Sequence, residues 1–299
     1  YEIVASLVCS EMCIRDSHLG IRHSLLNGSF TGYADLRRYN VIIMPSGYLE
    51  MSDYEVNALN DWIKQGGTLI AHNRSSRFIA TNETLGDVKQ LQDVLDKSID
   101  YNFDLLREIY ALEDNLDQEA ALKHIVDLET TYPWELNETN YSEDELKNRD
   151  KWQSIFMPSG AFVAGRTDQK HWLTFGTPKT LPVLYGNYPV LMTGNNAEAP
   201  IRIGELVENS DVNEFRTINW STLPAGKDIK VRMSGLVWPE AAQRIANSAY
   251  LTREQVGTGQ IILFAGEPNF RGSTRGTNRV WLNAIVYGPG LGTSPRIQL

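Results

Sequence analysis

The sequence has few cysteines, no excess of positive charge and no long apolar run. Its two cysteines, Cys9 and Cys13, stand close together, so the rest of the 299 residues is cysteine-free, which is compatible with any compartment. No apolar run approaches the roughly 20 residues that span a bilayer, so no membrane span is predicted. The net charge of −9 argues against a nucleic-acid partner bound through its phosphates.

The start of the chain has an unusual composition. Residues 6–17, which contain both cysteines, resemble a translated sequencing adapter, and we predict that residues 1–17 are not native. A CxxxC pair could otherwise suggest a metal or redox site, but that interpretation fails if the segment is an artefact. Residues 18–299 are then the domain, and no signal peptide can be identified because the true start is missing.

Several catalytic and cofactor motifs are absent. The five histidines form no HxxE or HExxH pair, and the nearest approach to ligand spacing is His124 with Asp127, which we interpret as a surface pair on one helical turn. Phosphate-binding GxGxxG and P-loop patterns are missing, as is the GxSxG elbow of hydrolases. No cofactor is therefore expected in this chain.

The most informative stretch is residues 257–292. Ile261–Phe264 is a short, branched apolar run after two turn glycines, which predicts a strand buried on both faces. A polar loop follows, and then a short amphipathic helix that Gly288 is expected to end. Ligands of open α/β sheets bind at the carboxyl ends of strands, so the loop residues Glu267, Asn269 and Arg271 are candidate site residues.

A second unit of this kind lies near the N-terminus. Val41–Met44 is predicted to be a buried strand, and Ser52 with Glu55 predicts a capping box at the start of a helix. TLIAH at 68–72 is the next strand, which makes a right-handed βαβ unit with parallel strands. We expect this unit and the closing strand to share one sheet.

The two units are separated by a long middle section. Residues 84–155 have helical periodicity, and Glu83–Lys151 carries 19 acidic and 7 basic residues, against 18 and 21 elsewhere, which indicates a solvated acidic insertion. Residues 160–235 are rich in short branched runs and predict strands and hairpins. A helix is expected at Glu240–Tyr250. The predicted fold class is α/β, with a mostly parallel sheet flanked by helices, a helical insertion and a β-rich section.

The layout around the strand ends resembles the core of class I glutamine amidotransferases. In those enzymes a cysteine follows one strand and a histidine follows another, and here these positions fall on Asn73 and near Glu267. Asn73 cannot form the acyl intermediate, and His72 is one residue off, on the opposite face of its strand. A serine hydrolase using Ser46, Ser75 or Ser76 with His72 is an alternative, although serines at strand ends are ordinary turn residues.

Longer runs resemble a more specific family. DLRRYNVIIMPSG, WIKQGGTLIA, SGLVWPEAAQRIANSAYLTREQVGTGQIILFAGEPNFRG and GTNRVWLNAIVYGPGLGTSP are similar to the C-terminal part of large bacterial zinc carboxypeptidases, after the peptidase domain. The resemblance implies a flavodoxin-like sheet without glutaminase activity. It also implies that the zinc ligands lie in an upstream peptidase domain, and that the setting is periplasmic or extracellular. No HxxE is present, so no catalytic residue is carried over.

The first functional hypothesis is therefore a non-catalytic accessory domain of a zinc metallocarboxypeptidase, with the upstream peptidase domain as its partner. The alternatives are a peptide- or glycan-binding module, or a hydrolase with an atypical site. In either alternative the site is expected at the strand ends, at Ser46, Asn73, Glu267, Asn269 and Arg271. Arg271 lies near Arg275 and Arg279, which suggests either ion pairs within the fold or a carboxylate-binding site.

Overall fold

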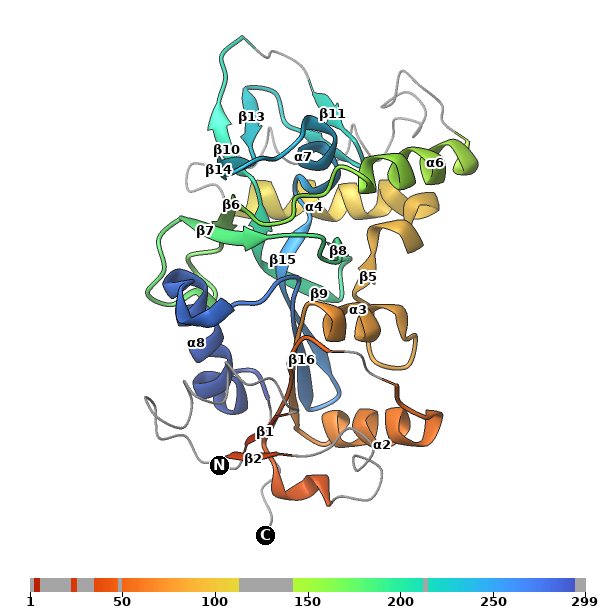
Figure 1. Cartoon of the computed structure of the whole chain (residues 1–299), viewed down its shortest axis with the longest axis vertical. Helices are drawn as coiled ribbons and strands as arrows, with labels where there is room; N and C mark the ends of the chain where they lie inside the picture. Colours follow the sequence, from red (N-terminus) through yellow and green to blue (C-terminus); the bar gives the residue numbers. More distant parts are fainter. Residues whose placement is uncertain are drawn as a thin grey trace.

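One large sheet organises the chain. The computed structural model describes residues 3–5, 23–25, 35–47, 50–112, 142–211 and 215–293. The strand order is β14-β6-β9-β15-β16-β4-β3-β1-β2, with β5, β7 and β8 paired to its members (Figure 1). No helix within the described ranges is long and apolar enough to cross a membrane.

One half of the sheet is parallel. Its strands are β1 (Ile3–Ala5), β2 (His23–Leu25), β3 (Val41–Met44), β4 (Thr68–His72) and β16 (Gly259–Phe264). Every residue of β3, β4 and β16 is buried, which explains why their sequences are continuous apolar runs and do not alternate. β4 pairs in parallel with both β3 and β16, so the prediction that the two units share one sheet is confirmed.

Helices cover both faces of this parallel half. α2 (Asp53–Lys64) and α3 (Arg74–Thr81) lie on one side, and α8 (Arg275–Leu291) lies on the other (Figure 1). α2 begins with the predicted capping box, in which the Ser52 N–H donates to Glu55 Oε2 at 2.8 Å and the Glu55 N–H donates to Ser52 Oγ at 3.4 Å. α8 continues past its predicted end at Gly288.

The other half of the sheet is antiparallel, which corrects the prediction of a mostly parallel sheet. Four strand pairings of the large sheet are parallel and seven are antiparallel. The antiparallel strands are β5 (Lys89–Gln90), β6 (Ala161–Thr167), β7 (Thr180–Tyr185), β8 (Leu191–Met192), β9 (Ala197–Ile203), β14 (Arg232–Ser234) and β15 (Ala249–Val256). Five strands of the β-rich section join the same sheet, and their short connections favour antiparallel neighbours.

The helix predicted at Glu240–Tyr250 is wrong in its second half. α7 (Pro239–Ile245) ends early, and Tyr250 belongs to β15, which lies between β9 and β16. This strand was not recognised in the sequence because Arg253 and Glu254 interrupt its apolar pattern. Both charges have partners, since Glu254 Oε1 accepts the Asp87 N–H at 2.8 Å and Arg253 Nη1 lies 3.2 Å from Glu198 Oε2.

The remaining elements lie around the antiparallel half. They are the strand pair β10 (Glu205–Glu208) and β13 (Lys227–Lys230), the pair β11 (Arg216–Ile218) and β12 (Ser221–Leu223), and the helices α4 (Ser98–Leu112) and α6 (Glu143–Ser154). The helices fall where the helical insertion was predicted. His124, Asp127, Cys9 and Cys13 lie outside the described residues. β1 falls within residues 1–17, whose non-native origin stays a prediction.

The packing of β4 predicts a large difference between two isoleucine substitutions. Ile70 is fully buried in the sheet, whereas Ile155 is 75% exposed. Ile70→Ala should lower the free energy of unfolding by about 2–5 kcal/mol, because it leaves a cavity among close-packed strands. Ile155→Ala should change it by less than about 0.5 kcal/mol. Urea unfolding followed by circular dichroism measures both, and equal effects would contradict this core.

Candidate functional site

The carboxyl ends of three parallel strands meet at one edge of the sheet. Met44 of β3 lies opposite Ala71 of β4, and His72 lies opposite Phe264 of β16. The residues that follow these strands therefore share an edge, which we call the carboxyl rim (residues 45–47, 73–77 and 265–271). The five residues predicted as a ligand site, Ser46, Asn73, Glu267, Asn269 and Arg271, all belong to its three segments.

Asn73 forms a tight turn between β4 and α3. Its backbone angles are φ 47° and ψ −107°, a conformation that costs a non-glycine residue about 1–3 kcal/mol. Its N–H donates to the Phe264 carbonyl at 3.0 Å, and its own carbonyl accepts the Arg77 N–H at 2.9 Å, which begins the helix. The structure thus has a strained strand-to-helix elbow at the position where the resemblance to amidotransferases placed the nucleophile.

Two serines fasten the first turn of α3 to the sheet. Ser75 Oγ donates to the Pro45 carbonyl at 2.6 Å, and Ser76 Oγ donates to the Phe264 carbonyl at 2.8 Å. Both side chains are fully buried. These hydroxyls hold the elbow against the ends of β3 and β16, which favours the structural interpretation of the two serines. Ser46 is half-buried in the turn after β3.

His72 is packed beneath the rim. It is fully buried, and its ring lies edge-on to Phe264 at a centroid distance of 5.4 Å and to Trp281 of α8 at 6.2 Å. Successive residues of a strand point to opposite faces, so His72 does not share the face of Asn73. Its ring packs instead against the aromatic side chains of Phe264 and Trp281. This position does not suit a base that must reach a substrate at the elbow.

The loop after β16 places its predicted site residues in different environments, one buried and one exposed. Asn269 is 2% exposed, and neither polar atom of its side chain has a hydrogen-bond partner within the described chain. Arg271 is exposed, and its guanidinium carbon lies 5.1 Å above the ring of Phe270. Arg279 donates to the Phe175 carbonyl at 3.3 Å. This hydrogen bond to the backbone is neither of the two expected roles, which were an ion pair within the fold and a carboxylate-binding site.

Tyrosines beside Glu267 were not predicted. The rings of Tyr185 and Tyr188 are 5.5 Å apart, and a Cβ atom on Gly266 would lie 2.9 Å from Tyr188 and 3.1 Å from Tyr250. Glycine thus lets these rings pack against the end of β16. Burial, and secondarily the negative charge of Glu267, raise the pKa of Tyr188 to about 12. Only the YGNYP run hinted at this cluster.

Metal binding has no support in the described ranges. Those residues contain no group of three or more His, Cys, Asp or Glu side chains that could hold a metal ion. The described residues therefore provide no set of ligands for a zinc ion, which the family resemblance implies for an upstream domain.

Comparisons with known proteins find only distant structural similarity. No family profile matches the chain, and no curated protein sequence matches it. A ThuA-like protein from Bacteroides uniformis has a TM-score of 0.45 at 11% identity, over 95% of this chain and 89% of that one. A ThuA-like protein from Parabacteroides merdae has a TM-score of 0.46 at 8% identity, over 99% and 92%. A β-galactosidase from Rahnella sp. R3 has a TM-score of 0.40 at 12% identity, over 94% of this chain and 30% of that one. The fold that the coordinates themselves establish is a mixed α/β sheet with flanking helices.

The strained elbow predicts that glycine is preferred at residue 73. Asn73→Gly should raise the free energy of unfolding by about 1 kcal/mol, because glycine adopts this conformation without steric cost. Asn57→Gly, at an exposed position within α2, is the control and should lower it by a few tenths of a kcal/mol. Both are measured by urea unfolding. A loss of stability in Asn73→Gly as large as in the control would contradict the strain.

The Tyr188 environment predicts a loss of stability in alkali. The folded-state pKa of about 12 exceeds the ordinary value of 10.0, so the stabilising contribution is complete below pH 10 and is lost as the pH rises through 12. Glu267→Gln should lower the Tyr188 pKa, because it removes a nearby negative charge. Tyrosinate absorbance during pH titration, with Tyr188→Phe to assign the signal, measures the shift. An unchanged titration in Glu267→Gln would refute the electrostatic influence of Glu267 on Tyr188.

Proposed function

We propose that the chain is a non-catalytic accessory domain on a flavodoxin-like, glutamine amidotransferase-type scaffold. Its parent is a zinc metallocarboxypeptidase whose active site lies in an upstream domain, which the sequence runs quoted above support. The parallel strands β3, β4 and β16, with α2 and α8 on opposite sides, agree with such a scaffold. The same resemblance supports a periplasmic or extracellular setting.

The observation that carries this proposal is the elbow at Asn73. Amide cleavage at such a turn needs a thiol or hydroxyl nucleophile and a base that activates it. A carboxamide occupies the turn, while the hydroxyls of Ser75 and Ser76 donate to backbone carbonyls. His72 lies among aromatic rings below the rim. A strained strand-to-helix turn is thus combined with side chains that serve packing, which supports a scaffold without catalysis.

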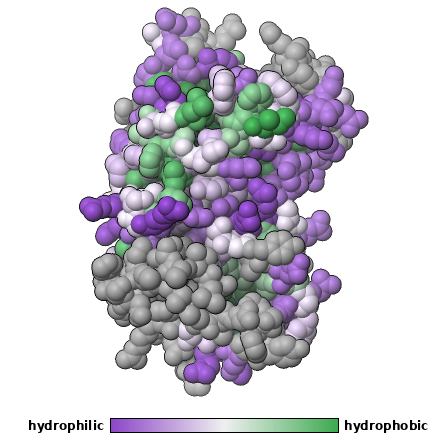
Figure 2. All heavy atoms as spheres, viewed as in Figure 1, coloured by the Kyte–Doolittle hydropathy of each residue, from purple (hydrophilic) through white to green (hydrophobic). Residues whose placement is uncertain are grey.

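A packing role is supported by exposed apolar side chains on the antiparallel half. Ile155, Leu236 and Trp238 are 75%, 66% and 50% exposed, and Trp238 lies 6.3 Å from Phe156 between ring centroids. Figure 2 shows hydrophobic residues gathered on the half of the molecule where Figure 1 draws α6 and α7. Exposed apolar patches often mark contact with another protein surface, which is consistent with packing against the peptidase domain.

A second candidate function is the binding of a peptide or glycan at the carboxyl rim. Asn269 supports it, because a buried amide without a partner costs about 1–3 kcal/mol, a cost that folded proteins usually avoid. Ser46, Glu267 and Arg271 are the other polar groups of this candidate site. The hydrolase alternative has the same residues but no nucleophile and base arranged together among the described residues.

The proposal is tested by activity and by the upstream DNA. The purified chain, with and without added zinc, should release neither ammonia from glutamine nor a C-terminal residue from peptides, because the rim provides no activated nucleophile. Turnover by the wild type that Asn73→Ala abolishes would contradict the proposal. The reading frame upstream of residue 18 should encode a zinc-binding HxxE, and an upstream frame without a peptidase would disprove the parentage.

A further inference from the structure

A cavity of about 270 Å³ lies between the antiparallel part of the sheet and α4. It is lined by residues of α4, β9, the loop before β9 and the loop after β6, and by no residue of the carboxyl rim. Segments distant in the sequence thus converge on one space. A pocket with a few convergent polar groups is the usual form of a small-ligand site.

One wall of the cavity is fixed by Arg202. This side chain is 3% exposed, and its guanidinium binds Glu108 through both carboxylate oxygens at 2.7 and 2.6 Å. It also donates to the Asn247 carbonyl at 3.0 Å and to Thr193 Oγ1 at 2.8 Å. Such a bidentate pair is rigid, and Glu108 neutralises the one arginine that lines the cavity among the described residues.

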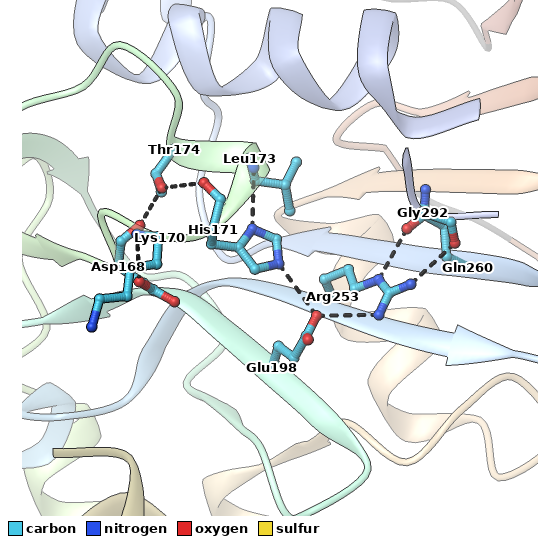
Figure 3. A network of polar contacts seen from close by, with 9 residues as sticks. All are labelled: Asp168, Lys170, His171, Leu173, Thr174, Glu198, Arg253, Gln260 and Gly292. Atoms are coloured by element: carbon cyan, nitrogen blue, oxygen red, sulfur yellow. Dashed lines mark hydrogen bonds and ion pairs between the residues drawn. The ribbon is translucent and has the colours of Figure 1, made fainter. Parts of the chain in front are cut away.

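A second wall is fixed by Glu198. Figure 3 shows its carboxylate between His171 and Arg253, whose Nε2 and Nη1 atoms each lie 3.2 Å away. His171 Nδ1 accepts the Leu173 N–H at 3.1 Å, so Nε2 carries the proton and donates to Glu198. The hydrogen bond from His171, and then the charge of Arg253, lower the pKa of Glu198. Arg253 therefore neutralises an ionised Glu198.

Two further carboxylates of the lining are not neutralised in this way. Asp168 Oδ1 accepts the Lys170 N–H at 2.8 Å, and Asp168 forms no ion pair with a described residue. Asp104 is 19% exposed, and its nearest described cation, Arg107 Nη1, is 3.9 Å away on a half-exposed side chain. Burial raises the pKa of Asp104, although the charges of Arg107 and Arg202 act in the opposite direction.

The rest of the lining is largely apolar. Leu112, Ala197, Ala199 and Pro200 contribute aliphatic surface beside the two carboxylates. The cavity is much larger than a bare metal ion, and the described residues include no group of three metal ligands. Its chemistry instead suits a positive group on an aliphatic stem.

We propose that this cavity binds the basic side chain of a peptide, an alkylguanidinium or alkylammonium group. The cation lies between Asp104 and Asp168, and its methylene groups pack on Ala197, Ala199 and Pro200. The anchored pairs of Arg202 and Glu198 hold the walls in place before binding. This site goes beyond the proposed accessory role and does not depend on the identity of the parent enzyme.

Calorimetric titration of the whole chain with Nα-acetyl-arginine amide tests the proposal. Nα-acetyl-citrulline amide is the matched probe, because it has nearly the same shape without the charge. Arginine amide should bind at least about tenfold more tightly than citrulline amide, and the difference should shrink in high salt. No binding of arginine amide, or equal binding of the two probes, would overturn the proposal.

Variants locate the site. The double variant Asp104→Asn with Asp168→Asn should weaken arginine amide binding by about tenfold or more. Asp61→Asn, at an exposed position of α2 away from the lining, is the control and should leave the affinity unchanged. The introduced carboxamides carry no charge to desolvate, so the double variant should stay folded, which thermal unfolding checks. Asp168→Asn alone serves as a second variant, and unchanged affinity in both would overturn the assignment.

Discussion

The strand β16 is the constraint on which the rest of the structure depends. All six of its residues are buried, and it pairs in parallel with β4 on one side and antiparallel with β15 on the other. Its first residue, Gly259, has no room for a side chain, since a Cβ atom there would lie 1.9 Å from the Ile63 carbonyl oxygen. Gln260 Nε2 donates to the Gly288 carbonyl of α8 at 2.8 Å. β16 thus connects both halves of the sheet and a covering helix.

The candidate functional sites follow from this arrangement. The Phe264 carbonyl at the end of β16 accepts both the Asn73 N–H and the Ser76 hydroxyl, so the strand fixes the elbow. On the other side, β15 carries Arg253, which neutralises Glu198 in the wall of the cavity. The rim and the cavity are therefore built on opposite sides of β16. The rim contains the strained turn at Asn73, and the cavity is lined by the carboxylates of Asp104 and Asp168.

Local signals in the sequence were sufficient for the parallel half. The run Val41–Met44, the capping box at Ser52 and the run Ile261–Phe264 each predicted an element that the structure confirms. β15 was missed because buried Glu254 is satisfied by backbone N–H groups from a distant loop, which no local pattern reveals. Hairpins were predicted for residues 160–235, but their place in the same large sheet was missed because pairing partners depend on tertiary contacts.

The site was predictable only in part, for a similar reason. Strand ends in a parallel sheet identify Ser46, Asn73 and Glu267 without coordinates. The burial of Asn269 and the contact of Tyr188 with Gly266 depend on how the loop after β16 folds back. Asp104 and Asp168 come from elements far apart in the chain, and neither has a motif around it. Their convergence could not be inferred from spacing.

Native-state hydrogen exchange tests most directly whether β16 joins the two halves into one cooperative unit. The amides of β4 in the parallel half and of β9 in the antiparallel half should exchange with the same free energy of opening, and with the same urea dependence, because both require the sheet to open at β16. A markedly lower free energy for β9 than for β4 would show that the halves unfold independently, and would contradict the central role of β16.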